Sequence, residues 1–205
     1  MDVNSSRQHM CSSVKINQMG IDSFNRVMVF IDGSNFYKGL SLVAGTGYRL
    51  DFGKFINYLI GDRHLVRSYY YNVVLPEGES SAKVHQGFIN YIKSVPRVTV
   101  KLGKLEKRGS DFAEKGVDIQ IAVDMVKLGI KRAYDTAILV SGDSDFTDVI
   151  KAVQDEGIIV ENASFEPISS YRLAQQSDCY ISLDHLDWDK FRAPTMKEEF
   201  TNQDG

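Results

Sequence analysis

One pattern constrains the fold of this chain most, and it occurs twice. An apolar run is followed directly by acidic residues and then by a helical pattern. Thr136–Val140 is followed directly by residues 141–146, of sequence SGDSDF, and then by an amphipathic pattern. Residues 27–31 are likewise followed by residues 32–35, of sequence DGSN. Buried strands that carry acids at their carboxyl ends are typical of α/β folds that bind hard cations. The sequence therefore predicts an α/β protein whose strand ends form the functional site.

Composition narrows the class of protein further. The chain has 205 residues, 43% of them hydrophobic and 25% charged, which predicts one ordinary globular domain. A net charge of -3 gives no overall nucleic-acid signature, although a local basic patch would suffice for binding. Cys11 and Cys179 are far apart and match neither a disulfide framework nor zinc spacing, so we expect a reducing, cytoplasmic setting. No apolar stretch approaches the roughly 20 residues of a membrane helix, so we expect no membrane partner.

Apolar strand patterns alternate with helical patterns along the chain, which predicts a mainly parallel sheet with helices on both faces. Strands are expected at residues 26–31, 66–75, 97–102, 136–140, 158–161 and 180–183, and helices at 34–43, 51–60, 82–94, 117–130, 145–156 and 169–176. Residues 103–115, rich in Lys and Arg, are expected to form a loop. The domain prediction is a mobile N-terminal extension over 1–25, one domain over 26–189 and a polar C-terminal tail over 190–205.

The acidic residues follow a pattern that predicts one site. Asp32 ends the first strand, and Asp143 and Asp145 follow the fourth, which is often its neighbour in doubly wound sheets. Asp118 lies in the first turn of the helix at 117–130, near the carboxyl edge of the sheet. Asp124 lies about 9 Å further along the helix axis. We therefore expect the first four to form the site and Asp124 to support it or pair nearby.

Such a group of carboxylates suits metal-assisted chemistry on phosphates. Mg²⁺ and Mn²⁺ prefer oxygen ligands, neutralise an anionic phosphodiester and lower the pKa of a bound water. Crowded aspartates would repel each other strongly without a cation. The sequence therefore predicts a Mg²⁺ or Mn²⁺ site with phosphodiesters as substrates.

Each residue taken alone also has a simpler interpretation. Asp145 is well placed to cap a helix, and Asp118 could complement the helix dipole. Residues 69–71, three consecutive tyrosines, fit a strand buried on both faces better than a platform for stacking bases. The conjunction of the acids at strand ends is the stronger signal.

Five segments carry a specific combination of motifs in a fixed order: residues 30–37 (FIDGSNFY), 114–118 (EKGVD), 122–125 (AVDM), 134–146 (YDTAILVSGDSDF) and 173–181. In this combination and order they resemble the NYN domain proteins of the LabA-like (DUF88) group, within the PIN-like nuclease superfamily. The resemblance covers residues 26–183.

The resemblance implies a PIN-like, Rossmann-like three-layer α/β/α sandwich with a mainly parallel sheet and a divalent-metal ribonuclease site. It implies that the catalytic and metal-binding residues are Asp32, Asp118, Asp143 and Asp145, and that cleavage leaves 5′-phosphate and 3′-hydroxyl ends. Asn35 matches a polar residue beside the first aspartate that could hold a water or a phosphate oxygen. We count Ser34, Ser141, Ser144 and Asp124 as supporting residues.

Basic residues are expected to flank this site and to contact the RNA backbone. They are Lys38, in the first helix, and Lys101, Lys104, Lys107, Arg108 and Lys115, which precede Asp118. The alternative is a solvated charged loop, since Asp111 and Glu114 offset part of the charge.

The predicted function is a Mg²⁺- or Mn²⁺-dependent ribonuclease, and specifically an endoribonuclease, that hydrolyses RNA phosphodiesters with a metal-activated water. Single-stranded or loop regions of RNA are the expected partner, and a homodimer is compatible with the sequence. The alternative is a metal- and RNA-binding regulatory module without significant turnover. A phosphatase of the haloacid dehalogenase type would need a second aspartate at the position of Ser34, so that class is disfavoured.

Overall fold

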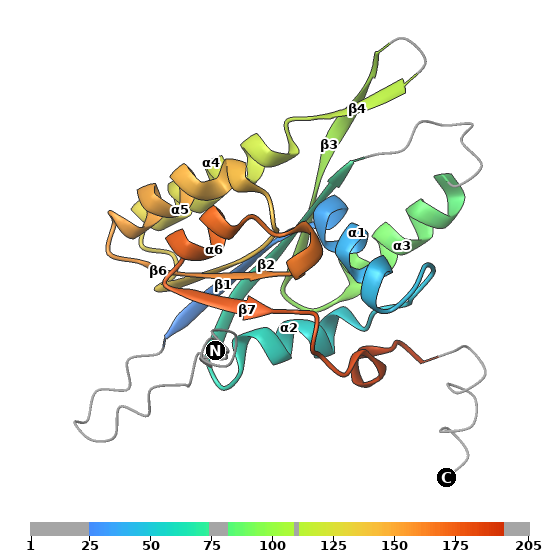
Figure 1. Cartoon of the computed structure of the whole chain (residues 1–205), viewed down its shortest axis with the longest axis horizontal. Coiled ribbons are helices and arrows are strands. Elements are labelled where there is room, and N and C mark those ends of the chain that lie inside the picture. Colours follow the sequence, from blue (N-terminus) through green and yellow to red (C-terminus); the bar gives the residue numbers. More distant parts are fainter. Residues whose placement is uncertain (1–24, 74–81, 109–110, 195–205) are drawn as a thin grey trace, which may run out of the picture.

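The computed structural model describes residues 25–73, 82–108 and 111–194, and of residues 104–108 and 111–115 it describes the backbone alone. Helices cover both faces of a central sheet (Figure 1). The strands are β1 (Arg26–Asp32), β2 (His64–Val73), β3 (Val98–Arg108), β4 (Asp111–Lys115), β5 (Thr136–Val140), β6 (Ile159–Ser164) and β7 (Cys179–Ser182). The α-helices are α1 (Gly33–Val43), α2 (Phe52–Ile60), α3 (Ala82–Ser94), α4 (Val117–Ile130), α5 (Thr147–Gln154) and α6 (Tyr171–Gln176). Short 3-10 helices are η1 (Ser144–Phe146), η2 (Glu166–Ile168) and η3 (Trp188–Phe191).

The sheet has seven strands in the order β4-β3-β2-β1-β5-β6-β7. β4 is antiparallel to β3, and every other pair of neighbours is parallel. The chain moves outward from β1 on one side and from β5 on the other, so the strand order reverses between these two strands. The predicted neighbourhood of the first strand and the strand at Thr136–Val140 is confirmed, and this reversal is where open α/β sheets place their ligands.

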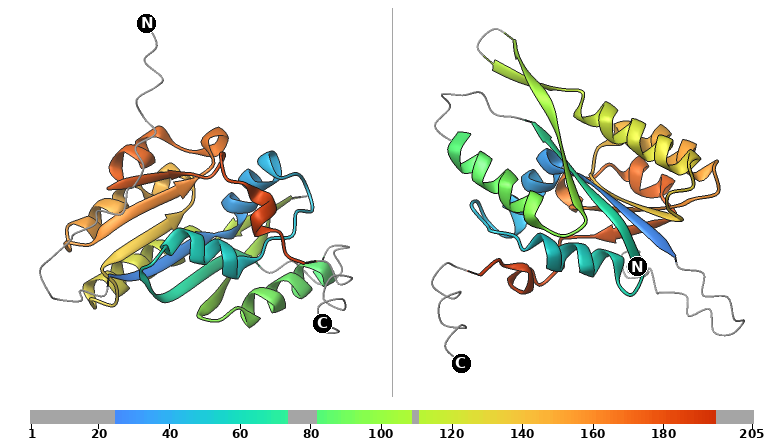
Figure 2. Two further views of the ribbon diagram at one scale, coloured as in Figure 1. Left: turned by 90° about the horizontal axis from the view of Figure 1, so that it is seen from below. Right: turned by 180° about the vertical axis from the view of Figure 1, so that it is seen from behind.

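Alternate residues of β1 point into two separate cores. Val29 and Ile31 pack with residues of α1, α2, α3 and η3, whereas Met28 and Phe30 pack with residues of α4, α5 and α6. Figure 2 shows the resulting three layers from two further directions. Because both faces of the central strands are buried, these strands read as continuous apolar runs. The predicted three-layer α/β/α sandwich with a mainly parallel sheet is confirmed.

The consecutive tyrosines of β2 belong to this interior. Tyr70 and Tyr71 are both 0% exposed and enter opposite cores. Their burial confirms the strand interpretation over a platform for stacking bases.

The predicted loop over residues 103–115 is wrong. β3 continues to Arg108 and pairs with β4 as an antiparallel ribbon that projects from the body of the sheet (Figure 1). Lys104 pairs with Lys115 at its base, next to the start of α4. A projecting ribbon needs no continuous apolar face, so its charged sequence carries little of the periodicity by which strands are recognised.

The end of the described chain packs against the domain. Trp188 is 7% exposed, and its ring stacks on Phe165 with 5.6 Å between centroids. Phe191 is also 7% exposed, and the Ala193 N–H donates to the carbonyl of Arg49 at 2.8 Å. Packing therefore reaches beyond the boundary expected at 189. Residues 1–24 and 195–205, which hold most of the expected extension and tail, lie outside the described residues. None of the described helices has the length and apolar character needed to cross a membrane.

Candidate active site at the carboxyl edge of the sheet

Asp32 joins β1 to α1 without an intervening loop. Its Oδ1 accepts a hydrogen bond from the Asn35 N–H at 3.1 Å, which caps α1, and its Oδ2 accepts one from the Ser141 hydroxyl at 3.0 Å. The next residue must be glycine because a Cβ on Gly33 would lie 2.4 Å from the Tyr70 hydroxyl. Asp32 is 5% exposed, so its carboxylate is fixed by hydrogen bonds inside the edge of the sheet.

Asn35 ties α1 to the loop that follows β5. Its Oδ1 accepts a hydrogen bond from the Gly142 N–H at 2.9 Å. On the other side, the Gly142 carbonyl accepts from the Ser170 N–H at 2.9 Å, and a Cβ on Gly142 would lie 2.4 Å from the carbonyl oxygen of Ile168. The glycine of the SGDSDF segment is therefore needed for close packing, and its loop is held between α1 and the segment after η2.

Ser141 links the two strand ends. Its hydroxyl donates to Asp32 and accepts from the Asp143 N–H at 3.2 Å, and it is 1% exposed. Asp143 Oδ1 in turn accepts from the Asp145 N–H at 2.9 Å and caps η1. The simpler interpretation of Asp145 as the cap of the following helix is wrong, because the chain first forms a 3-10 turn, and Asp143 caps that turn. Within the described parts of the chain, neither Asp143 nor Asp145 forms an ion pair.

Asp118 reaches this edge from a different direction. It lies in the first turn of α4, directly after a reversal at Gly116, whose φ of 81° favours glycine. α4 packs against β1, β2, β3 and η1. It begins directly after β4, beside the base of the β3–β4 ribbon (Figure 1), and Asp118 is exposed there.

The acidic residues share an edge but do not form a closely grouped set. Among the residues that the structure describes, no three His, Cys, Asp or Glu side chains are grouped so that they could hold a metal ion. Asp32 and Asp143 are brought together through Ser141, whereas Asp118 and Asp145 are exposed nearby. The assignment of these four residues as metal ligands stays a prediction. The atoms with which these residues would bind a metal are all carboxylate oxygens, which suit Mg²⁺ or Mn²⁺.

Asp124 belongs to a second polar cluster beside the first. Its Oδ2 accepts a hydrogen bond from the Tyr71 hydroxyl at 2.8 Å and forms an ion pair with the Lys101 ammonium. Burial and the bond to Asp124 raise the pKa of the Tyr71 phenol, so Tyr71 stays protonated and acts as the donor. The sequence predicts that Asp124 supports the site or pairs nearby, but it identifies neither Tyr71 nor Lys101 as a partner, because those contacts depend on strand register and on how α4 packs against the sheet.

The remaining candidate residues lie around these clusters. Ser34 is half-buried in the first turn of α1, and Lys38 is exposed one turn later. Ser144 is exposed in η1. Lys104, Lys107, Arg108 and Lys115 lie in the β3–β4 ribbon, where only the backbone is described. The link between Asn35 and Gly142 was also missed, and no local sequence signal could have indicated it.

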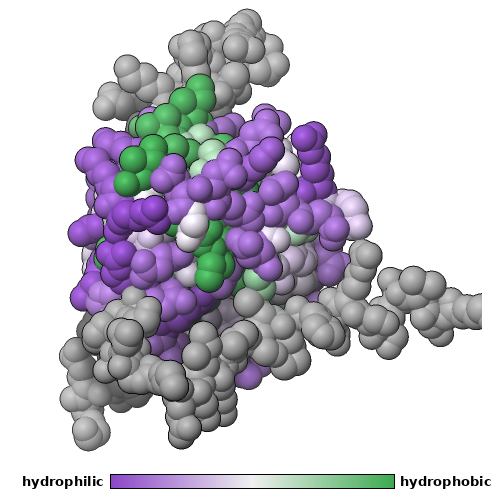
Figure 3. Space-filling view, turned by 90° about the vertical axis from the view of Figure 1, so that its left-hand side faces the viewer, coloured by the Kyte–Doolittle hydropathy of each residue, from purple (hydrophilic) through white to green (hydrophobic). Residues whose placement is uncertain are grey.

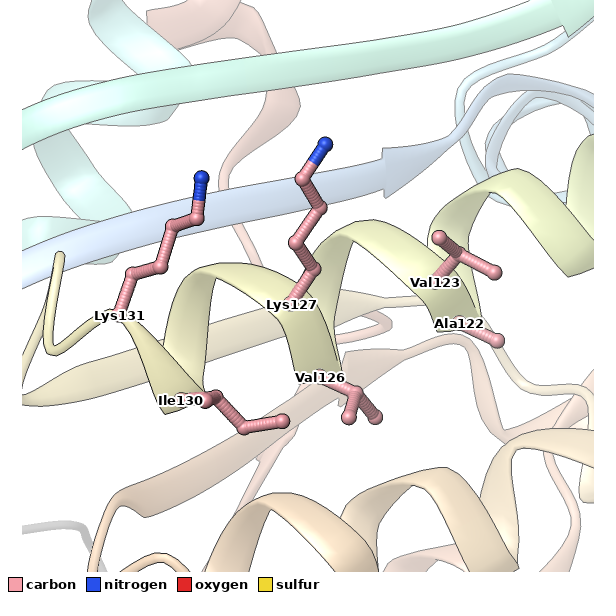
Figure 4. A pocket seen from close by; sticks show the side chains of 6 residues that line it. All are labelled: Ala122, Val123, Val126, Lys127, Ile130 and Lys131. Carbon is pink, nitrogen blue, oxygen red and sulfur yellow. The ribbon is translucent and has the colours of Figure 1, made fainter.

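A separate hollow lies on the outward side of α4. It has a volume of about 530 Å³ and is lined by Ala122, Val123, Val126, Lys127, Ile130 and Lys131. Figure 4 shows that both lysines point to one side of the helix, and Figure 3 shows an apolar patch among polar residues on the side of the molecule at the left of Figure 1. Val123 and Ile130 are 54% and 59% exposed. This lining contains no carboxylate, so the hollow is not a site for a hard cation.

Comparisons with known proteins agree with the geometry. The family model for the NYN domain matches residues 26–184. The low amplitude and bright protein LabA of Synechococcus elongatus is 25% identical over 170 residues, which cover 79% of this chain and 86% of that protein. The uncharacterized protein y4oD of Sinorhizobium fredii is 29% identical over 103 residues, 49% of this chain and 47% of that protein.

A solved structure has the same fold. A crystal structure of a protein of unknown function from Vibrio parahaemolyticus superposes with a TM-score of 0.62 at 19% identity, over 85% of this chain and 100% of that one. The chain therefore belongs to the NYN domain family, in its LabA-like group, within the PIN-like nuclease superfamily.

Proposed function

We propose that this protein is a divalent-metal-dependent ribonuclease, and specifically an endoribonuclease acting on single-stranded or loop regions of RNA in the cytoplasm. The observation that carries the proposal is the hydrogen-bonded link from Asp32 through Ser141 to Asp143, at the point where the strand order reverses in a NYN fold.

The residues of the chain would divide the work as follows. Asp32, Asp118, Asp143 and Asp145 would hold Mg²⁺ or Mn²⁺. Such a cation neutralises the phosphodiester and lowers the pKa of a bound water. Ser141 orients the Asp32 carboxylate, because its hydroxyl donates to Oδ2. No described side chain needs to act as a nucleophile in hydrolysis by water.

The amide oxygen of Asn35 holds the loop after β5 against α1, and it is therefore not the atom that would contact RNA. That oxygen already accepts the Gly142 N–H. Its amide nitrogen is the group that could donate to a phosphate oxygen or a water.

The test is cleavage of a labelled single-stranded RNA by the purified chain with Mn²⁺ or Mg²⁺, with and without EDTA. We expect cleavage that EDTA stops and Asp143→Asn abolishes, with 5′-phosphate and 3′-hydroxyl ends on the products. Asp155→Asn is the matched control, because it makes the same charge change at an exposed position at the end of α5. Unchanged cleavage by Asp143→Asn would refute the assignment.

The alternative is a metal- and RNA-binding regulatory module without significant turnover. The absence of a three-ligand group among the described side chains favours it, since a site that assembles poorly would bind without catalysing. In the same assay this alternative predicts RNA that is retained by the protein and uncut in Mn²⁺.

A further inference from the structure

Three neighbouring strands place a row of polar side chains beside the proposed site. Asp32 is the register partner of Tyr71, and Tyr71 is the register partner of Lys101. Partners in a parallel sheet share a face, and Tyr71 packs in the α4-side core. Strands are about 4.8 Å apart, so the β3 backbone at Lys101 is about 10 Å from the β1 backbone at Asp32. The row therefore runs from the acidic edge towards the base of the β3–β4 ribbon.

The Lys101 ammonium is held in place but not enclosed. It forms an ion pair with Asp124 and lies 5.0 Å from the centroid of the Tyr69 ring. The Asp124 carboxylate accepts a hydrogen bond from the Tyr71 hydroxyl, and Asp124 is 9% exposed. The side chain of Lys101 is 33% exposed, and an ammonium has three N–H donors. Donors therefore remain for a ligand that arrives from solvent.

We infer that Lys101 anchors a backbone phosphate of the RNA next to the one that is cleaved, and that Asp124 and Tyr71 position it. The inference rests on the proposed function. A compact, strongly hydrated point charge suits a phosphate better than a base edge. The chain is acidic overall at -3, so binding of a polyanion depends on local cations of this kind.

The path of the chain supports the same placement. β3 continues from Lys101 into the ribbon segment that carries Lys104, Lys107 and Arg108. A strand of RNA that leaves the acidic edge past Lys101 would continue along this basic segment. The inference differs from a purely structural ion pair, which would contribute to folding and leave the salt dependence of RNA binding unchanged.

The experiment measures binding without cleavage. The full chain with Asp143→Asn serves as the parent, and its affinity for a labelled single-stranded 20-mer is measured in Mg²⁺ from low to high salt. We expect Lys101→Met to weaken binding about tenfold, for several RNA sequences alike, because a hydrogen bond between charged groups is lost. The slope of log K against log salt should fall by about 0.7, the value for one phosphate contact on a single strand.

Three further variants separate anchoring from structure. Lys101→Arg should keep the parent slope, because the charge remains. The double variant Lys101→Met with Asp124→Asn has the same net charge as the parent, and it does not leave the Asp124 carboxylate without its ion-pair partner. It should still show the reduced slope of log K against log salt, because the Lys101 ammonium is missing. Lys151→Met, an exposed lysine of α5, is the matched control and should behave as the parent.

The outcomes are distinct. Parent-like affinity and slope in both Lys101→Met and the folded double variant would overturn the inference and leave the proposed function standing. A parent that binds no RNA with or without metal would instead refute RNA as the substrate, and the inference would fall with it.

Discussion

Carboxylates near the two ends of the parallel strands have different partners. In the amino half of the sheet, where these strands begin, two acids form ion pairs with guanidinium groups of the chain. Asp135 accepts from Arg26 at 2.8 Å and 3.1 Å, and Glu161 accepts from Arg63 at 2.5 Å and 3.0 Å. Arg26 holds the pKa of the Asp135 carboxyl below its usual range.

At the carboxyl edge, Asp32 and Asp143 are organised by neutral donors. Asp32 accepts from the Ser141 hydroxyl and a backbone N–H, and Asp143 accepts from a backbone N–H. In the described parts of the chain, Asp143 and Asp145 have no ion-pair partner. In the amino half, the chain therefore neutralises carboxylates with its own arginines, and these contacts contribute to stability. Asp143 and Asp145 have no such arginine among the described residues, so the carboxyl edge is the better candidate for binding a cation from solution.

The largest expected effect is at Asp32. Asn also caps helices, so Asp32→Asn should keep α1 and the fold while it removes the charge. We expect RNA cleavage in Mn²⁺ to fall by more than the roughly 100-fold that loss of an outer partner of a metal site costs. Initial rates and thermal unfolding of the same preparation check this. A rate within threefold of that of the unsubstituted chain would show that the Asp32 carboxylate is not needed for cleavage, and the two halves of the sheet would then not differ in function.

The amino half should respond in stability instead. Arg63→Met leaves Glu161, 5% exposed, without its charge partner and also removes donors to the carbonyls of Leu59 and Ile60. We expect a loss of about 3 kcal/mol in the free energy of unfolding, measured in urea, with unchanged activity per folded molecule. Arg63→Met combined with Glu161→Leu should recover at least half of that loss. A loss below about 1 kcal/mol would mean that the pair behaves as a surface ion pair.

A smaller effect is expected at the hydroxyl that joins Asp32 to Asp143. Ser141→Ala should lower activity or metal affinity by about 10- to 100-fold and stability by about 1 kcal/mol. The matched control is Ser68→Ala on β2, because Ser68 is 0% exposed and its hydroxyl has no hydrogen-bond partner among the described residues. The metal concentration for half-maximal cleavage distinguishes the two. Equal behaviour of both alanine variants would show that Ser141 only fills space.

Much of the fold could be predicted because its signals are local. The apolar run of β5 and the helical patterns of α3 and α4 give bounds that agree with the structure residue by residue. The convergence of Asp32 with Asp143 also follows from a general rule on strand ends. The β3–β4 ribbon was missed because its charged residues resemble a loop, and its pairing partners are held by backbone hydrogen bonds that leave no periodic trace.

The site could be predicted only as a list of residues at one edge. The role of Ser141 as the bridge depends on the register of Ile31 with Val140, which no local pattern reveals. The pairing of Asp124 with Lys101 depends on how far α4 is displaced along its axis relative to β3. Local sequence fixes which face a residue occupies, whereas packing decides which partner it meets.

The smallest expected effect concerns the pH dependence of stability at Asp135. Because Arg26 lowers the pKa of Asp135 in the folded chain, this contact stabilises the fold above the unfolded value near 3.8, and the stabilisation is lost as the pH falls through the lowered pKa. Both side chains are about 40% exposed, so the contribution should stay below about 1 kcal/mol.

Urea unfolding of the chain and of Asp135→Asn at pH 7, 5 and 3 measures this contribution as a difference. The difference should be constant from pH 7 to 5, shrink by pH 3, and also shrink in high salt, which screens an exposed pair. Arg26→Met should abolish the same pH dependence. A difference that persists unchanged at pH 3 would mean that the contact acts through charge-independent hydrogen bonds. Of these two arginine–carboxylate pairs, Arg63 with Glu161 would then support charge matching in the amino half, and Arg26 with Asp135 would not.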